Sequence, residues 1–416
     1  MKRLTANLQA APADQKGLTD RAVNEAENRL AKNPADRGAG KSLVAALLQK
    51  VRENADPGIY VRIDETLRTL GGVRSTDPEV LVLAAPLLLA RHEFADALSV
   101  GKRALVMLPG NSSVYGILVD AYNELGRYDE ALVATQQMID SRPGLAAFAR
   151  VSYARELRGD VAGALQAMQQ AVIAGQGVGE NAAYVQTLLG NLFLSNGDTR
   201  NAAKSYADAL VAFPGFGAAR SGQAAVLAAC GKPLDAATAI GAVIDQQPVL
   251  QYAIAQVDYF LAAGKAKEAE IARQLVDAIA ALQRAGGVDI DLEMAVYEAN
   301  RRPTASLLER TRRVVASRPS VTGRDALAWV LHRSGKHAEA QKEMAPVLSL
   351  GDRDPVYRFH AAAIAFATNN LSDARANLAI VLAGNPSAAG INPRELEELR
   401  RKLADTAPRE TRTKGK

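Results

Sequence analysis

The sequence predicts an all-α protein, a right-handed α-solenoid (superhelix) of about ten antiparallel helix hairpins. Pro109 and Pro143 lie 34 residues apart, as do Pro214 and Pro248, and each ends a helical pattern because proline lacks a backbone N–H. A glycine followed five residues later by an alanine recurs at a similar spacing, and no segment has the alternating pattern of a strand. These steps are Gly126/Ala131, Gly159/Ala164, Gly197/Ala202, Gly231/Ala236, Gly264/Ala269 and Gly335/Ala340.

The clearest single hairpin is the stretch VYGILVDAYNELGRYDEALVATQQMIDSRP. Tyr115, Leu118 and Tyr122 are spaced i, i+3, i+7, which is the periodicity of one face of a helix. Gly126 permits the tight turn that ends this first helix. Ala131 is small enough for the second helix to cross the first closely.

The same register divides the whole chain. We expect an N-terminal capping helix in residues 1–36, tandem repeats in 37–386, and a C-terminal capping helix with a basic tail in 387–416. End elements with a polar outer face stop a stack of repeats from growing. The expected helix pairs cover residues 37–75, 78–109, 112–143, 145–176, 182–214, 217–248, 250–285, 290–319, 321–352 and 355–386, with single helices at about 18–32 and 393–405.

This pattern resembles the tetratricopeptide repeat (TPR) family over nearly the whole chain, and in particular a group of long bacterial members. The resemblance implies a right-handed superhelix with a concave groove, and a scaffold or adaptor rather than a reaction. Similar proteins often carry an Asp-His pair around the position of Asn300 and Arg301, which this chain lacks. The motifs that carry the resemblance are ARHEFADAL (90–98), VYGILVDAYNELGRYDEAL (114–132), RVSYARELRGDVAGAL (150–165), VDIDLEMAVYEAN (288–300) and DALAWVLHRSGKHAEA (325–340).

Composition excludes several classes of protein. Hydrophobic residues are 48% and charged residues 23%, as in a soluble chain with a large hydrophobic core. The sequence contains no run of 18 apolar residues, the length that a membrane span requires. The net charge is +5, of which residues 409–416 supply +3 (four Lys or Arg, one Glu), so the body of the chain is close to neutral and a nucleic-acid partner is not expected. A single cysteine, Cys230, excludes an internal disulfide. We expect a soluble protein that is either cytoplasmic or exported with its signal peptide already removed.

Two short motifs resemble those of nucleotide-binding or metal-binding enzymes, but the sequence around each does not fit such a site. The string ADRGAGKS (35–42) resembles a phosphate-binding loop, but a helix ended by Pro34 precedes it instead of a strand. His92-Glu93 begins like a zinc-protease helix, yet Asp96 stands where the second histidine is needed. We therefore expect no enzyme activity, no catalytic residue, no cofactor and no metal site.

The predicted binding surface is the concave face, lined by the first helix of each hairpin. In the hairpin with Gly126, the stripe described above faces the core, so the remaining face turns inward. This track begins acidic and amide-rich, which suits hydrogen bonds to a peptide and to basic side chains, and we expect a partner's basic portion there. Its residues are Asp120, Asn123, Glu124, Tyr153, Glu156, Tyr184, Asn191, Gln251, Asp258, Asp325, Trp329, His332 and Arg333.

The sequence thus predicts a non-enzymatic protein–protein interaction scaffold that binds a partner protein or peptide in this groove and could belong to a larger assembly. No motif identifies the partner. Two alternatives stay open: a helical-repeat nucleic-acid-binding protein, and a cryptic hydrolase or nucleotide-binding protein. The acidic residues of the track disfavour the first, because they would repel phosphate.

Overall fold

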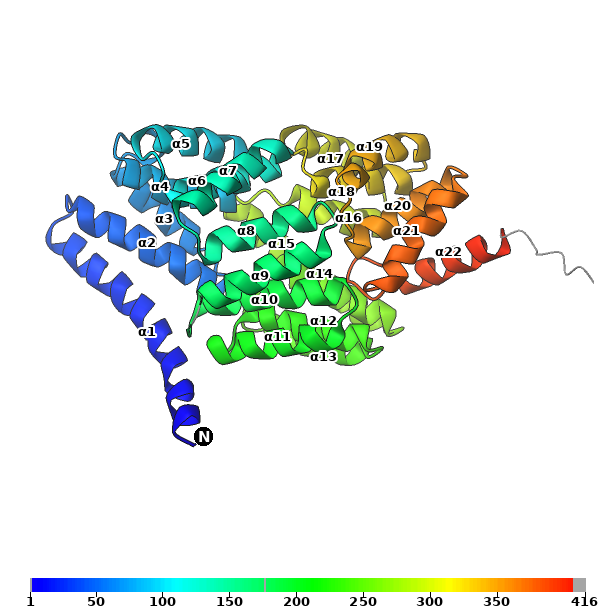
Figure 1. Cartoon of the computed structure of the whole chain (residues 1–416), viewed down its shortest axis with the longest axis horizontal. Coiled ribbons are helices and arrows are strands. Elements are labelled where there is room, and N and C mark those ends of the chain that lie inside the picture. Colours follow the sequence, from blue (N-terminus) through cyan, green and yellow to red (C-terminus); the bar gives the residue numbers. More distant parts are fainter. Residues whose placement is uncertain (1, 176, 407–416) are drawn as a thin grey trace, which may run out of the picture.

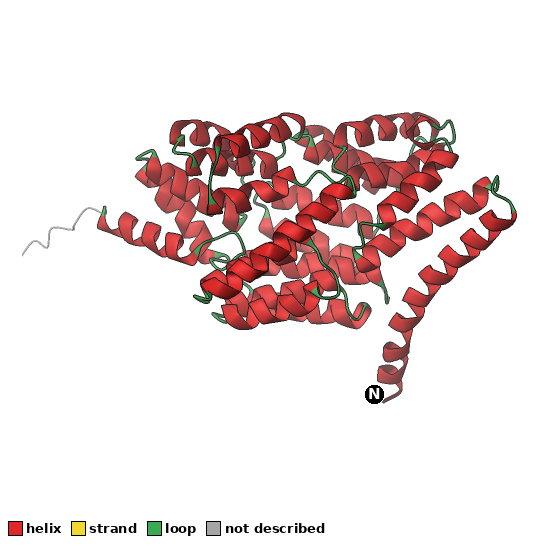
Figure 2. Ribbon diagram, turned by 180° about the vertical axis from the view of Figure 1, so that it is seen from behind, coloured by secondary structure: helices red, strands yellow, loops and turns green. Residues whose placement is uncertain are grey.

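The computed structural model describes residues 2–175 and 177–406, with side chains of the first helix described from residue 17 onward. Within these residues the chain is all-α, with 22 α-helices, one 3-10 turn and no strand (Figure 2). This confirms the predicted all-helical repeat solenoid.

Helices α2 to α21 form ten antiparallel hairpins, each made of an even-numbered first helix and an odd-numbered second helix. First helices of many successive hairpins also contact one another, as α4 does α6 and α16 does α18, and we call the first helices the inner layer. The helices are α1 (Lys2–Lys32), α2 (Arg37–Asn54), α3 (Ile59–Thr69), α4 (Pro78–Ala90), α5 (Phe94–Met107), α6 (Ser112–Glu124), α7 (Tyr128–Ser141), α8 (Leu145–Glu156), α9 (Val161–Ala174), α10 (Glu180–Ser195), α11 (Thr199–Ala212), α12 (Gly217–Ala229), α13 (Pro233–Ile244), α14 (Leu250–Ala262), α15 (Ala266–Ala285), α16 (Asp291–Arg301), α17 (Ala305–Ser317), α18 (Val321–Arg333), α19 (His337–Ser349), α20 (Pro355–Ala367), α21 (Leu371–Ala383) and α22 (Pro393–Asp405), with the 3-10 turn at Gly72–Arg74.

The end helices lie at opposite ends of the molecule. Helix α1 extends away from the body of the solenoid, and α22 emerges at the other end (Figure 1). The expected start of the first helix near residue 18 is wrong, because α1 begins at Lys2. Pro12 and Gly17 lower helix propensity there, and the backbone stays helical through both.

The turns inside the hairpins need the left-handed backbone region, which favours glycine. His92 (φ 63°) and Asn369 (φ 59°) occupy the same position in the second and tenth hairpins. The glycines of this set are Gly126 (φ 68°), Gly159 (70°), Gly197 (81°), Gly231 (76°), Gly264 (73°) and Gly335 (76°).

Small residues also bring neighbouring hairpins together. The ring of Tyr206 on α11 is fully buried between Gly190 of α10 and Gly222 of α12. A Cβ on Gly190 or Gly222 would lie 2.5 or 2.3 Å from that ring, so only glycine leaves room for it. Close approach of backbones thus replaces the large aromatic core that this chain lacks.

The ribbon of hairpins returns on itself after six hairpins. The turn of each early hairpin contacts the loop that lies six hairpins further along the chain; we call these contacts the interturn seam. The seam joins Glu53 to Gln247, His92 to Asp289, Gly126 to Pro319, Gly159 to Gly351, and Gly197 to Gly384. The second turn of the superhelix therefore packs edge to edge against the first.

Hydrogen bonds fix the register of this seam. The ring Nδ1 of His92 lies 2.6 Å from the Asp289 carbonyl oxygen, and the Val321 amide donates to the Tyr128 hydroxyl at 2.6 Å. At the glycines the contact is backbone to backbone: a Cβ on Gly159 would lie 2.4 Å from the Gly351 carbonyl oxygen. Along this seam the gap between the two turns, and so that side of the interior of the superhelix, is closed.

Candidate functional site

Two tyrosines mark the accessible part of this interior. Tyr153 on α8 and Tyr184 on α10 belong to neighbouring hairpins, and their side chains remain 39% and 45% exposed. Desolvation nevertheless raises the pKa of both phenols. Both rings thus contact solvent while protein atoms desolvate their hydroxyls, and their contact with a partner stays a prediction.

Polar groups lie beside these rings. Arg150 on α8 donates to both carboxylate oxygens of Asp120 on α6, at 2.9 Å through Nε and 2.5 Å through Nη2. Asn191 is exposed and accepts from the Tyr206 hydroxyl at 2.8 Å. Of the other predicted residues in this part of the chain, Asn123 is half-buried and Gln251 is exposed.

Three predicted acids instead contact parts of the chain that come much later in the sequence. Arg318 donates to Glu124 at 2.7 Å, and the amide of Gly390 donates to Asp258 at 2.8 Å. Glu156 lines a small space together with Asp352 and Asp354. These intrachain contacts engage Glu124 and Asp258, and the role of both residues in partner binding stays a prediction.

The predicted residues in the ninth hairpin are not available either. Asp325 is 2% exposed and both its oxygens lie 3.0 Å from Nδ1 of His360. Trp329 is 1% exposed, donates through Nε1 to Asn300 at 2.7 Å, and stacks on His360 with ring centroids 4.0 Å apart. The prediction that Asp325 and Trp329 face a partner is wrong: α16, α18 and α20 pack together and bury this face of α18.

The two potentially cationic groups at the end of the track are neutralised. His332 stacks on Trp329, and burial lowers the pKa of His332 to about 4, so the ring is neutral near pH 7. Arg333 donates to Glu395 of α22 at 3.0 Å. This end of the track holds the capping helix in place.

A carboxylate cluster lies at the seam. Burial, followed by the charges of Asp352 and Asp354, raises the pKa of Glu156 to about 8. Burial, followed by the charge of Asp352, raises the pKa of Asp354 to about 6. Deprotonating all three groups places like charges between the two turns of the superhelix.

This cluster predicts a pH-dependent stability. The folded chain holds the Glu156 proton more tightly than the unfolded chain, whose pKa is near the ordinary 4.5. The free energy of unfolding should therefore fall as pH rises from about 4.5 to about 8, because the unfolded state binds fewer protons there. Glu156→Gln should flatten this fall and raise the melting temperature at pH 8, as followed by circular dichroism.

Glu339→Gln is the matched control, since a hydrogen bond from Lys336 lowers the pKa of Glu339. The difference in free energy of unfolding between Glu339→Gln and wild type should stay constant above about pH 5. The Glu339 carboxyl is then ionised in both the folded and the unfolded chain. Parallel curves for wild type and Glu156→Gln between about pH 5 and 8 would contradict the assignment.

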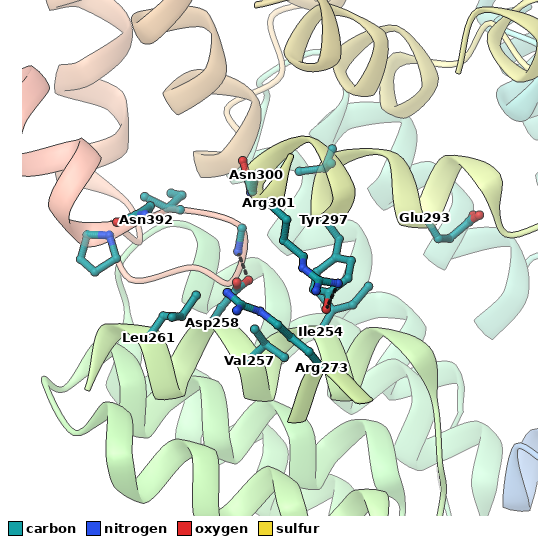
Figure 3. Close-up of a pocket in the computed structure, with 14 residues that line it drawn as sticks. Ile254, Val257, Asp258, Leu261, Arg273, Glu293, Tyr297, Asn300, Arg301 and Asn392 are labelled. Atoms are coloured by element: carbon teal, nitrogen blue, oxygen red, sulfur yellow. Dashed lines mark hydrogen bonds between the residues drawn. The ribbon is translucent and has the colours of Figure 1, made fainter. Parts of the chain in front are cut away.

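A cavity with a volume of about 130 Å³ lies between α14, α16 and the loop before α22. Figure 3 shows Arg273 and Arg301 reaching this space beside Tyr297. Sequence reasoning missed it, because the loop that closes it, residues 390–393, comes from the far end of the chain. Its lining residues are Ile254, Val257, Asp258, Leu261, Arg273, Glu293, Val296, Tyr297, Asn300, Arg301, Gly390, Ile391, Asn392 and Pro393.

No arrangement for metal chemistry appears in the part of the chain that the structure describes, where no group of three His, Cys, Asp or Glu side chains could hold an ion. Lys41, in the string that resembles a phosphate-binding loop, forms ion pairs with Asp77 and Glu79. Among the described helices, none combines the length and apolar character that a membrane span requires.

Comparison with known proteins bears on the fold. A tetratricopeptide repeat family model matches residues 88–152. No curated protein matches the chain in sequence.

Several solved structures are similar in shape. The APC/C hetero-tetramer Cut9–Hcn1 has 14% identity and a TM-score of 0.44, with 88% of this chain and 63% of that chain covered, so the chain spans less than two thirds of its length. TTC0263, a thermophilic TPR protein in Thermus thermophilus, has 19% identity and a TM-score of 0.32, covering 47% and 92%. A tetratricopeptide repeat protein from Parabacteroides merdae has 13% identity and a TM-score of 0.36, covering 69% and 98%.

Proposed function

Because the chain carries tetratricopeptide repeats in an all-helical solenoid, we propose that it is a non-enzymatic scaffold that binds a partner protein or peptide in the interior of its superhelix. The observation that carries this proposal is the pair Tyr153 and Tyr184. Both rings keep a large exposed fraction on the inner layer, in an environment that desolvates their hydroxyls.

Such tyrosines are suited to anchoring a polypeptide. Tyrosine offers a large rigid contact area with a polar end, and it is enriched among the residues that dominate binding energy. The Arg150–Asp120 pair beside Tyr184 offers a donor and an acceptor to a peptide backbone. We infer an extended segment that crosses α6, α8 and α10, with its side chains against the two rings.

Residues of this surface also argue against the two alternative functions, nucleic-acid binding and a cryptic hydrolase or nucleotide-binding activity. The Asp354 carboxylate, which is mostly ionised near pH 7, would repel a phosphate backbone. Hydrolysis would need a nucleophile within hydrogen-bond reach of a base, and the interior tyrosines have no such neighbour among the contacts of the described residues.

The test places a photoactivatable phenylalanine analogue at Tyr153 or Tyr184. We expect crosslinks to a partner from these positions and none from Val133 or Val211, which are 65% and 56% exposed on the second helices. With the crosslinked partner purified, Tyr153→Ala plus Tyr184→Ala should weaken binding at least about tenfold, or 1.4 kcal/mol.

Val133→Ala plus Val211→Ala is the control, with an expected change below about twofold. It truncates two exposed apolar side chains of the second helices to alanine. A loss in the valine variant without one in the tyrosine variant would place the interface on the convex surface and end the proposal.

A further inference from the structure

The superhelix has a free edge whose charge differs from that of the interturn seam. Hairpin turns in the first part of the chain are covered by the second turn of the superhelix, whereas the later ones are not. Around Gly231, Gly264 and Gly335, no atom lies within 4 Å of the position that a Cβ would take. These turns lie on the same edge of the superhelix as the seam, but no later hairpin of the described chain packs against them.

Each free turn is a Gly-Lys pair. Lys232, Lys265 and Lys336 follow the three glycines directly, and all three side chains are exposed. The turn of the eighth hairpin, which lies between the second and third of these, carries Arg301 and Arg302, also exposed. These five cations form what we call the basic rim.

The covered turns carry different residues at the same position. Glu93, Arg127, Asp160 and Asp198 follow the turn residue there. The one cation among them, Arg127, is paired with Glu130 at 2.5 Å. In the rim, Lys336 is paired in the same way with Glu339 at 3.1 Å, and Arg301 lies 4.0 Å from Asp277. Among the described residues, neither Lys232 nor Lys265 has an ion-pair partner, and these two lysines set the rim apart from the covered turns.

The rim lysines stand against local helix preference. Lys232, Lys265 and Lys336 are the N-cap residues of α13, α15 and α19, and none makes a side-chain capping hydrogen bond. An N-cap favours Asp, Asn, Ser or Thr, and a positive charge opposes the helix dipole at that end. Asp160 and Asp198 follow this preference in the covered turns. Lys336 has a compensating contact with Glu339, whereas Lys232 and Lys265 break this rule without one among the described residues, which makes those two candidates for function.

The cavity described above opens beside this rim. Leu261 and Arg301, which line it, belong to the last turns of α14 and α16 and so adjoin Lys265 and Arg302. Its aliphatic lining can take an apolar side chain, and the buried Nε of Arg273 has no hydrogen-bond partner within the described structure. A ligand with carboxylates and an aliphatic group could pair its carboxylates with the basic rim and place its aliphatic group in the cavity.

We propose that the basic rim and the adjoining cavity dock an acidic protein segment that carries an aliphatic anchor. The rim cations belong to successive hairpins, and packed helices lie about 8–10 Å apart. A nucleic-acid strand carries a charge on every unit and has no neutral unit that could face Asp235 and Glu268 near the lysines. Separate acidic side chains fit this alternation of charge better than a phosphate chain does. The rim is separate from Tyr153 and Tyr184, so this site can fail while the proposed interior site holds.

The test uses a short fluorescent peptide of repeated Glu-Glu-Leu, the same peptide with lysine in place of glutamate, poly-L-glutamate, and a single-stranded oligodeoxynucleotide. Binding is measured by fluorescence anisotropy at ~0.1 M salt, where charges further apart than about 10 Å are largely screened. We expect wild type to bind the Glu-Leu peptide and not the lysine peptide. Lys232→Glu, Lys265→Glu and Lys336→Glu combined should weaken binding at least about tenfold.

The matched control reverses three exposed lysines that lie on second helices and not in the rim turns: Lys102→Glu, Lys204→Glu and Lys342→Glu. It changes net charge equally and should alter binding less than about twofold. Leu261→Asn should weaken the Glu-Leu peptide while leaving poly-L-glutamate unchanged. The rim variant should fold, because glutamate suits a helix N-terminus better than lysine does, and circular dichroism verifies this.

Three results would overturn the proposal. Wild type could fail to bind the Glu-Leu peptide. Both triple variants could lose affinity equally, which would show an effect of net charge alone. The oligodeoxynucleotide could bind more tightly than the peptide and depend on the rim, which would make the surface a nucleic-acid site.

Discussion

Gly159→Ala is expected to lower the free energy of unfolding by about 2–5 kcal/mol, whereas Gly231→Ala should cost about 1–2 kcal/mol. Both glycines end the first helix of a hairpin with a similar backbone, at φ 70° and 76°. An alanine in that left-handed region costs about 1–2 kcal/mol at either position. Only at Gly159 would the new methyl group also lie 2.4 Å from a carbonyl oxygen, that of Gly351. Overpacking of this kind costs about 1–3 kcal/mol more.

A second matched pair extends the comparison. Gly126 would place a Cβ 2.6 Å from the Pro319 carbonyl oxygen, while Gly264 has nothing within 4 Å. Urea unfolding of the four single variants, followed by helical circular dichroism, should separate the seam pair from the free pair. If all four variants lose the same stability, the two turns of the superhelix do not touch as described.

Sequence reasoning succeeded where the signal is local. The Gly126 to Ala131 step and the proline that closes the unit act within one hairpin, so the positions of α2 to α21 follow from backbone conformation and helix periodicity. The accessible tyrosines, Tyr153 and Tyr184, follow from the same register, because α8 and α10 pack as ordinary members of the stack.

The interturn seam could not be predicted in this way. Each hairpin adds a small rotation, and only the sum over six hairpins decides whether one edge of the ribbon meets the other. No residue spacing within a single hairpin encodes that sum. The sequence that carries Trp329 has the same periodicity as an inward-facing helix, yet packing by α16 and α20 buries it.

One sequence signal of the seam is visible in retrospect. The tripeptide Ser-Arg-Pro occurs at 141–143 and again at 317–319, before the first helices of the fourth and ninth hairpins. The first copy is exposed, whereas the second lies in the seam. The repeat marks equivalent positions, and only the three-dimensional course of the ribbon makes their environments differ.

Arg318→Ala is the seam variant with the largest expected electrostatic effect. The guanidinium is 12% exposed, donates to Glu124 at 2.7 Å and Glu293 at 2.9 Å, and lies over the ring of Phe94. Its removal leaves two carboxylates facing each other, one of them, Glu293, only 16% exposed. Breaking a buried ion pair costs about 3–5 kcal/mol. Because Glu124 is 30% exposed, we expect about 2–4 kcal/mol here.

The chain provides its own control in Arg142→Ala. Arg142 occupies the same position in the first Ser-Arg-Pro, where it is exposed and pairs with no described acid, so this change should stay within ~0.5 kcal/mol. Adding Glu293→Gln to Arg318→Ala should recover part of the loss, because it removes one of the two facing charges. If Arg142→Ala and Arg318→Ala shift the urea midpoint equally, Arg318 acts through net charge and not through the seam. If Glu293→Gln instead adds to the loss, charge repulsion is not what destabilises the variant.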